Sequence, residues 1–166
     1  MDKEEKVESI ESIKTIESIE TKQPETKQHH DEKTDQIVYF FIDPSGTWKA
    51  QFIFDNQTFI LEGTETQSDQ NRNEIQATLE VLQFLRNWIK PTVLFTIYSN
   101  SQYCITCYYK WIPQWITKGF RIGHTNKMRP NSDLLVKLHA FSTCMDFDLV
   151  QHYDDYESYQ QVISSI

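Results

Sequence analysis

The apolar positions between residues 37 and 61 fall into three short runs that predict strands. Ile37–Ile42 (IVYFFI) is apolar throughout, which is typical of a strand buried on both faces. Trp48–Phe54 (WKAQFIF) alternates apolar and polar side chains, and Thr58–Leu61 (TFIL) follows after Asp55 and Asn56, a pair that favours a tight turn. The three runs together predict an antiparallel meander.

Between Ser68 and Trp88 the apolar spacing changes from two residues to a helical period, which predicts a helix. Ser68 or Asp69 would cap its N-terminus, and Pro91 would end it. The apolar face of this helix would consist of Ile75, Leu79, Leu82 and Leu85.

Strands and helices alternate through the rest of the chain. Val93–Tyr98 (VLFTIY) predicts a second buried strand. The order of predicted elements is that of an α/β fold in which helices cover both faces of a sheet. The remaining elements are a helix from Ser101 to about Gly119 interrupted at Pro113, a helix from about Asn131 to Ala140, a strand over Met145–Val150 and a short helix over Tyr153–Ile163.

Composition divides the chain near residue 36. All 22 aromatic residues lie at or after Tyr39, whereas residues 1–36 carry 11 acidic and 6 basic side chains. Because so polar a segment cannot bury enough apolar surface to offset its ordering entropy, we expect a disordered acidic tail over residues 1–36 and one domain over residues 37–166. The tail places isoleucine at every third position, and the alternative is a helix that orders on a protein partner. These positions are Ile10, Ile13, Ile16 and Ile19.

Charge and composition narrow the class of protein. The net charge of −8 means that a nucleic-acid partner would have to meet a local basic patch. No apolar run approaches the roughly 20 residues of a membrane helix, and the acidic N-terminus lacks the apolar stretch of a secretory signal. Cys104 and Cys107 are better explained as small buried hydrophobes than as a zinc or redox site. We therefore expect an intracellular protein, cytoplasmic or nuclear, without a membrane partner.

Polar side chains stand where the predicted buried strands end. Asp43 directly follows Ile37–Ile42, Asn100 follows the strand that contains Val93–Tyr98, and Glu74 lies in the first turns of the long helix. Neighbouring strand ends with a helix beside them would bring these groups into one cluster. Clustered oxygen ligands of this kind suit Mg²⁺ or Mn²⁺, and two such ions could clamp the oxygens of a phosphodiester.

The motifs around these residues occur in a recognisable order. With this order, the chain resembles the type 1 ribonuclease H family from Ile37 to the C-terminus, about four-fifths of its length. The matching stretches are Asp43-Pro44-Ser45-Gly46, Asn71-Arg72-Asn73-Glu74, Tyr98-Ser99-Asn100-Ser101-Gln102-Tyr103, Lys110-Trp111-Ile112, Trp115, Gly119-Phe120 and Asn131-Ser132-Asp133-Leu134-Leu135.

The resemblance implies an α/β, ribonuclease H-like fold with a five-stranded mixed sheet flanked by helices on both faces. It also implies hydrolysis of the RNA strand of an RNA–DNA hybrid by two Mg²⁺ or Mn²⁺ ions held by four carboxylates. By motif position, Asp43 would bridge the metals, Glu74 would be the helix glutamate, and Asn100 would occupy the third position. The fourth position aligns with Gln160, and His152 resembles the mobile histidine that assists product release.

Two of the four ligand positions therefore hold amides, Asn100 and Gln160. Because an amide oxygen brings no charge to offset the dehydration of Mg²⁺, we expect weak or absent cleavage. Three explanations of Asn100 stay open: natural degeneration, which we favour, an engineered substitution, or compensation by Asp154 or Asp155. An active site would need Mg²⁺ or Mn²⁺, and a degenerate one need hold neither.

A nucleic-acid-binding surface can outlast catalysis, because the family holds a hybrid through its 2′-hydroxyls and phosphates. Asn71 and Arg72 match residues that approach the RNA backbone. A second group matches a basic protrusion that grips the DNA strand in many relatives, the alternative being a solvated helix face. This group consists of Lys110, Lys118, Arg121, Lys127 and Arg129.

Other conspicuous residues have simpler explanations. Trp111, Trp115 and Phe120 are expected to pack between helices rather than to stack on bases. The pair Asp154 and Asp155 is more typical of a helix N-terminus than of a metal site.

Three functions remain. The first is a weak or inactive module that binds RNA–DNA hybrid or duplex nucleic acid or serves as an interaction platform, with a protein partner reached through the tail. The second is an active Mg²⁺-dependent ribonuclease H, and the third is a structural protein that has lost nucleic-acid binding. Steep weakening of hybrid binding with salt would argue against the third.

Overall fold

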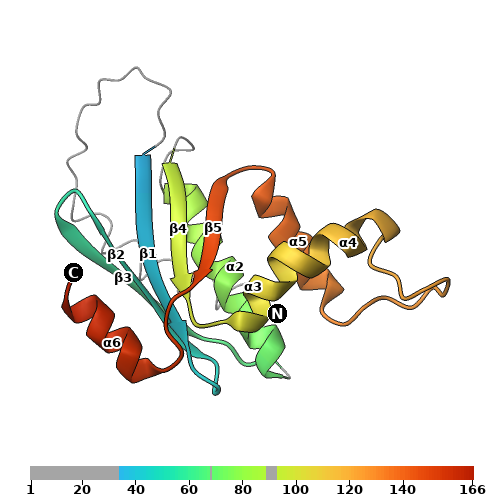
Figure 1. The fold of residues 1–166 in the computed structure, drawn as a ribbon, viewed down its shortest axis with the longest axis horizontal. Coiled ribbons are helices and arrows are strands. Elements are labelled where there is room, and N and C mark those ends of the chain that lie inside the picture. The colour runs from blue at the N-terminus through green and yellow to red at the C-terminus, as the bar shows by residue number, and fades with distance from the viewer. Residues whose placement is uncertain (1–33, 68, 89–92) are drawn as a thin grey trace.

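The computed structural model of the protein describes residues 34–67, 69–88 and 93–166. Strands from this part of the chain form one five-stranded sheet in the order β3-β2-β1-β4-β5 (Figure 1). The pairs β1–β2 and β2–β3 are antiparallel, whereas β1–β4 and β4–β5 are parallel, so the mixed sheet that we expected is confirmed. The strands are β1 (Thr34–Ile42), β2 (Thr47–Phe54), β3 (Gln57–Thr64), β4 (Val93–Ser99) and β5 (Asp146–Gln151).

The first and third strands are longer than their apolar runs. β1 begins at Thr34 rather than at Ile37, and Thr34 pairs with Val93 of β4. β3 exceeds Thr58–Leu61 at both ends because it pairs with β2 along its whole length. Backbone hydrogen bonds order polar residues as well as apolar ones, so hydrophobicity underestimates the length of a strand. The expected boundary at residue 36 thus falls inside β1, and the expected disorder of residues 1–33 concerns a segment outside the described residues.

The long helix α2 spans Gln70–Trp88. Asp69 is its N-cap, because the Oδ1 atom of Asp69 accepts a hydrogen bond from the backbone N–H of Arg72 at 2.9 Å. This selects one of the two caps that the sequence allowed. Ser68, the other candidate, and Pro91, the expected stop, lie outside the described residues.

Pro113 does not interrupt the helical segment after β4. The chain runs through α3 (Gln102–Thr106), the π-helical turn η1 (Cys107–Trp111), α4 (Ile112–Trp115) and the 3₁₀ turn η2 (Ile116–Lys118). The N–H of Ile112 bonds to the carbonyl of Cys107, so a wider turn directly precedes the proline, which has no N–H of its own. The predicted break is therefore wrong, and the segment ends at Gly119, whose φ is 65°.

Two helices complete the fold, α5 (Ser132–Ser142) and α6 (Tyr156–Ser164). α6 begins later than the expected Tyr153 because Asp155 caps it, its Oδ1 accepting from the N–H of Ser158 at 2.8 Å. The interpretation of Asp155 as a helix-terminal charge is therefore confirmed. No helix of the described part is long and apolar enough to cross a membrane.

Helices cover both faces of the sheet, as predicted (Figure 1). On one face, Val38 and Phe40 of β1 join the main core with α2, α3 and α5. On the other face, Phe41 packs against Tyr159 of α6 with ring centroids 5.4 Å apart. Because alternate residues of β1 enter different cores, the strand is apolar throughout. β1 thus holds its C-terminal end, where Asp43 follows, rigidly between two layers of helices.

Candidate functional site

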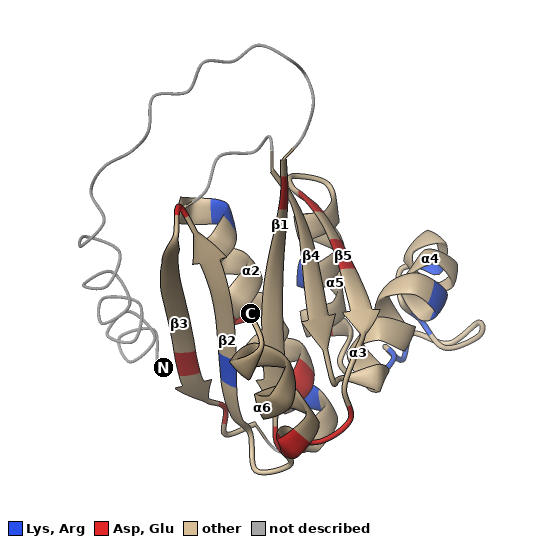
Figure 2. Cartoon of the chain, turned by 60° about the vertical axis from the view of Figure 1, so that its left-hand side comes forward, with Lys and Arg blue, Asp and Glu red and all other residues tan. Residues whose placement is uncertain are grey.

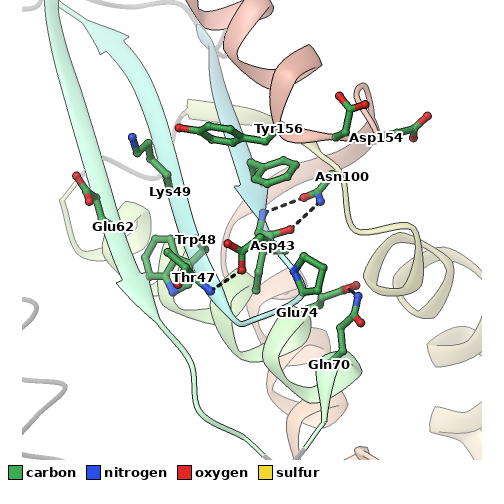
Figure 3. Close-up of a pocket in the computed structure, with 14 residues that line it drawn as sticks. Asp43, Thr47, Trp48, Lys49, Glu62, Gln70, Glu74, Asn100, Asp154 and Tyr156 are labelled. Carbon is green, nitrogen blue, oxygen red and sulfur yellow. Dashed lines mark hydrogen bonds between the residues drawn. The ribbon is translucent and has the colours of Figure 1, made fainter.

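A cleft of about 800 Å³ lies where β1 and β4 end, between the start of α2 and the start of α6. Asp43, Glu74 and Asn100 all line it, so the structure brings together the three residues that the strand-end argument singled out. In Figure 3, Asp43 and Asn100 lie between Tyr156 and Asp154 on one side and Glu74 on the other. The cleft is therefore the candidate active site.

Asp43 is held by the turn that follows it. Its Oδ1 accepts hydrogen bonds from the hydroxyl of Ser45 at 2.6 Å, from the N–H of Ser45 at 2.9 Å and from the N–H of Thr47 at 3.1 Å. The Ser45 hydroxyl, followed by the backbone amides, lowers the pKa of Asp43 below its ordinary value, so the group is a carboxylate at neutral pH. Gly46 completes this turn with φ +98°, and a Cβ there would overlap the carbonyl oxygen of Glu65.

Asn100 makes two hydrogen bonds to one residue of the neighbouring strand. Its Oδ1 accepts from the N–H of Ile42 at 2.9 Å, and its Nδ2 donates to the carbonyl of Ile42 at 2.8 Å (Figure 3). The side-chain amide thus continues the ladder of β1 and β4 after their backbones stop pairing at Tyr39 and Tyr98. These two bonds need a side chain that carries both a hydrogen-bond donor and an acceptor, as an amide does.

Both carboxylate oxygens of Glu74 also have partners. Oε1 accepts from the hydroxyl of Ser101 at 2.5 Å, and Oε2 accepts from the side-chain amide of Gln70 at 3.0 Å. Ser101 is buried and also caps α3 by accepting from the N–H of Cys104 at 3.1 Å. The glutamate of α2 is therefore tied to the segment that follows Asn100.

The structure does not bring Gln160 or His152 to the lining of the cleft. Gln160 is exposed on α6, next to Tyr159, whose buried ring fixes which face of the helix meets the sheet. His152 instead stacks on Tyr98 with ring centroids 4.3 Å apart. The cleft receives Asp154 and Asp155 from this part of the chain.

Aromatic walls of the cleft escaped the sequence analysis. Trp48 and Tyr156 line it, and the ring of Tyr156 lies 5.4 Å from that of Phe41. The signal for Trp48 was its position in β2 opposite Ile42, one residue before Asp43. The position of Tyr156 depends on the start of α6, which the apolar pattern misplaced.

The donors in the cleft do not fit the two-metal set that the resemblance implies. Asn100 is an amide whose oxygen already accepts from Ile42, and Glu74 uses both of its oxygens within the protein. Within residues 34–67, 69–88 and 93–166, no group of three or more His, Cys, Asp or Glu side chains is placed to hold a metal ion. Hydrogen bonds do not exclude a metal ion, because metal-binding carboxylates are commonly hydrogen-bonded as well. What this set lacks is charge, since an amide stands where the resemblance implies an aspartate.

Arg72 has a structural partner that the sequence analysis did not foresee. Its two terminal nitrogens bond the carboxylate of Asp133 at 3.0 and 2.8 Å, and one of them also bonds the Oδ1 of Asn131 at 3.1 Å. The guanidinium lowers the pKa of Asp133 below its ordinary value. The N-R-x-E motif of α2 and the N-x-D-L motif of α5 therefore hold each other, while Asn71 is exposed.

The predicted basic residues gather on one segment without acidic neighbours. Residues 102–132 contain no Asp or Glu, and Figure 2 shows blue and no red along α4. The four cations Lys110, Lys118, Arg121 and Lys127 are exposed, and Arg129 is half-buried. We call residues 102–132 the basic arm.

Stacked rings support the basic arm. Trp111 and Trp115 stack with centroids 5.2 Å apart, Lys110 lies 4.8 Å from the first ring, and the guanidinium of Arg129 lies 4.4 Å from the second. Phe120 is buried in the main core. The two tryptophans pack at the edge of this core, so helix packing, the simpler explanation of these rings, is confirmed.

The cysteines of the C-x-x-C pair are both buried free thiols. Burial raises the pKa of the Cys104 thiol to about 12, and it raises that of Cys107 as well. Neither group would be a thiolate at neutral pH, which agrees with their role as small hydrophobes.

Comparison with known proteins identifies the family. The profile of the RNase H family matches residues 35–150. The chain belongs to the RNase H family. Ribonuclease H of Prochlorococcus marinus (strain NATL2A) is 36% identical over 90 residues, 54% of this chain and 55% of that protein. Ribonuclease H of Hahella chejuensis is 32% identical over 89 residues, 54% and 57% of the two chains. The chain spans about half the length of these curated relatives.

Solved structures share the fold at low sequence identity. The foamy viral protease–reverse transcriptase in complex with RNA/DNA hybrid has a TM-score of 0.56 and 12% identity, and covers 86% of this chain and 20% of its own. LC9-RNase H1, a type 1 RNase H with the type 2 active-site motif, has a TM-score of 0.56 and 9% identity, over 84% and 72% of the two chains. The ribonuclease H-like fold expected from the sequence is therefore confirmed.

Proposed function

We propose that this protein is a degenerate RNase H domain that binds RNA–DNA hybrid or duplex nucleic acid and cleaves it weakly or not at all. The observation that carries the proposal is the pairing of the Asn100 side chain with both backbone groups of Ile42. At this position the resemblance implies a metal-binding aspartate.

An aspartate could not reproduce the contacts of Asn100. A carboxylate accepts hydrogen bonds but does not donate, so its second oxygen would face the carbonyl of Ile42 without a proton between them. The amide therefore suits its surroundings better than the carboxylate of an active family member would. This supports natural degeneration over an engineered substitution.

The other candidate ligands support weak metal binding. Position 100 holds an amide, and Gln160 lies outside the lining of the cleft. An amide brings no charge to offset the dehydration of a divalent ion. Asp43, whose pKa is lowered, is a carboxylate of the expected set and supports some retained metal affinity.

Nucleic-acid binding is supported by the basic arm. Its cations meet no acidic residue within the arm, so they present a positive surface on a protein of net charge −8. Phosphate contacts need positive charge and adaptable donors rather than catalytic carboxylates, so binding can persist without cleavage. A foamy viral relative in fold was solved with RNA/DNA hybrid.

The test is cleavage of a labelled RNA–DNA hybrid in Mg²⁺ and in Mn²⁺. We expect weak or no cleavage by the protein as it is, and hybrid binding that weakens steeply as salt rises. Restoration by Asn100→Asp alone would mean that the remaining ligands are intact and that one residue stopped the enzyme. Restoration only by Asn100→Asp with Gln160→Asp would mean that both positions are degenerate, and that residue 160 reaches the cleft although it lies outside the lining here.

A second candidate is an active, Mg²⁺-dependent ribonuclease H. The observation that favours it is the presence of Asp154 and Asp155 in the same cleft as Asp43. Cleavage by the unmodified chain, lost in both Asp43→Asn and Asp154→Asn, would establish this candidate and overturn the first. Hybrid binding that does not respond to salt would instead favour a structural or protein-interaction role.

A further inference from the structure

Charge is segregated between two parts of this chain. The basic arm carries five Lys and Arg side chains and no Asp or Glu. Residues 1–33, which precede β1, carry 10 acidic and 6 basic side chains. The two segments therefore attract each other electrostatically, and both belong to one polypeptide.

The tip of the basic arm also exposes apolar side chains. Arg121 and Met128 form a β-bridge, and the N–H of Ile122 bonds to the carbonyl of Lys127 at 2.9 Å, so residues 121–128 make a small hairpin. Ile122 is 37% exposed and Met128 is 49% exposed. On this hairpin, large apolar groups stand directly beside Arg121 and Lys127. A partner that satisfies both would combine carboxylates with aliphatic side chains.

The N-terminal segment has that combination. Three of its units place a glutamate two residues before an isoleucine: Glu8-Ser9-Ile10, Glu11-Ser12-Ile13 and Glu17-Ser18-Ile19. Each unit offers one carboxylate and one aliphatic side chain two residues apart. The carboxylates and isoleucines of the repeat thus complement the cations and the apolar side chains of the hairpin.

The connecting chain is long enough for an intramolecular contact. Residues 20–33 form a link of 14 residues, which spans about 46–50 Å when extended. A domain of this size has a radius of gyration of about 14 Å, and hence a diameter of about 36 Å. A covalent link of this length raises the effective concentration of the segment to about the millimolar range, so even a weak contact would be populated.

We infer that residues 8–19 of this chain dock on the basic arm, with their glutamates on its cations and their isoleucines on Ile122 and Met128. The segment would then compete with nucleic acid for the arm. The competition rests on the proposed function, whereas the docking does not. The acidic segment would act as a built-in inhibitor that only a sufficiently charged nucleic acid displaces.

Carbodiimide crosslinking of the full chain tests the docking without nucleic acid. This reagent joins carboxylates to lysine amines in direct contact, and mass spectrometry locates the products. We expect links from Glu8, Glu11 and Glu17 to Lys118 and Lys127, in a yield independent of protein concentration. Links that are as frequent to Lys137, an exposed lysine of α5, would overturn the docking. Links found only between two chains would overturn the contact within one chain and would mean that the segment docks on a second copy of the protein.

Hybrid binding in EDTA tests the competition. We compare the full chain carrying Glu8→Gln, Glu11→Gln and Glu17→Gln with a control of equal charge carrying Glu4→Gln, Glu5→Gln and Asp31→Asn. The first variant should bind hybrid about fivefold more tightly than the control. Equal affinities would overturn the competition. A chain that binds no hybrid would overturn the proposed function and the competition, and the crosslinks alone would then decide the docking.

Discussion

The hydroxyl of Tyr153 lies 2.8 Å from the carbonyl oxygen of Phe40, on the strand that carries Asp43. The same hydroxyl lies 2.8 Å from the carbonyl oxygen of Tyr98, on the neighbouring strand. Tyr153 therefore bridges β1 and β4 just where their backbones stop pairing. Burial raises the pKa of Tyr153, so its proton remains available to these carbonyls.

Removing this hydroxyl should destabilise the domain. Tyr153→Phe keeps the ring but removes the one proton that the carbonyls of Phe40 and Tyr98 share, and we expect a loss of about 1–3 kcal/mol in the free energy of unfolding. Urea denaturation followed by circular dichroism measures it. Tyr156→Phe, at an exposed tyrosine, is the matched control and should change stability by less than about 0.5 kcal/mol. Equal effects of the two substitutions would contradict the bridging role.

The turn after Asp43 should require glycine. Gly46→Ala adds a Cβ at φ +98° and forces it against the carbonyl of Glu65, whereas Gly123→Ala adds one at φ +57° with no heavy atom within 4 Å. We expect Gly123→Ala to cost about 1 kcal/mol for the left-handed backbone alone, and Gly46→Ala to cost more. Thermal unfolding of both variants tests this. Similar losses would mean that Glu65 moves aside freely.

The ion pair of Arg72 and Asp133 should make stability depend on pH. Because the folded-state pKa of Asp133 is lowered, its contribution is present above the unfolded value of 3.8 and is lost as pH falls through the folded value. The side chain of Asp133 is 64% exposed, so solvent screening limits the coupling to about 0.5–1 kcal/mol. A double-mutant cycle of Arg72→Ala and Asp133→Ala at pH 7 and at pH 2 measures it. A coupling that persists at the lower pH would show that charge is not its source.

The sequence located the strand ends of the site but not the contacts between distant motifs. Asp43 and Asn100 could be predicted from the sequence because each follows a run of apolar residues, and strands that pair in parallel end at the same edge. The partner of Arg72 could not be predicted from the sequence, since Asp133 lies 61 residues away and no local pattern marks the pair. Side-chain contacts of this kind depend on how two helices pack, which periodicity does not specify.

The fourth ligand position shows a different limit. Alignment of a short motif gave Gln160, but helix register follows the buried face, and here Tyr159 is the residue that enters the core. Successive helical residues point about 100° apart, so Gln160 turns away from the cleft. The Asp155 cap fixes where the helix begins, and it places Asp154 at the cleft instead. The capping contact of Asp155, rather than the apolar pattern, thus determines which residues of this region lie at the cleft.

Asn100→Asp should destabilise the fold even where it restores chemistry. The carboxylate would lose the bond donated to the carbonyl of Ile42, and we expect a loss of about 1–3 kcal/mol in the free energy of unfolding at pH 7. Chemical denaturation beside the cleavage assay measures both properties on one sample. Gln160→Asp, at an exposed site, should leave stability unchanged. An unaltered stability of Asn100→Asp would remove the argument that the amide is the native fit.

The basic arm should account for the salt dependence of hybrid binding. Each phosphate contact lowers the slope of log K against log salt by about 0.9 for B-form DNA, with similar behaviour expected for a hybrid. Lys118→Gln and Lys127→Gln should each weaken binding and make this negative slope shallower by about one, without altering any preference for sequence. Lys137→Gln removes the same charge from α5, outside the arm, and should leave the slope unchanged. Fluorescence anisotropy of a labelled hybrid over a range of salt concentrations distinguishes these variants. If all three lysine variants change the slope equally, the net charge of the protein governs binding and the arm is not the interface.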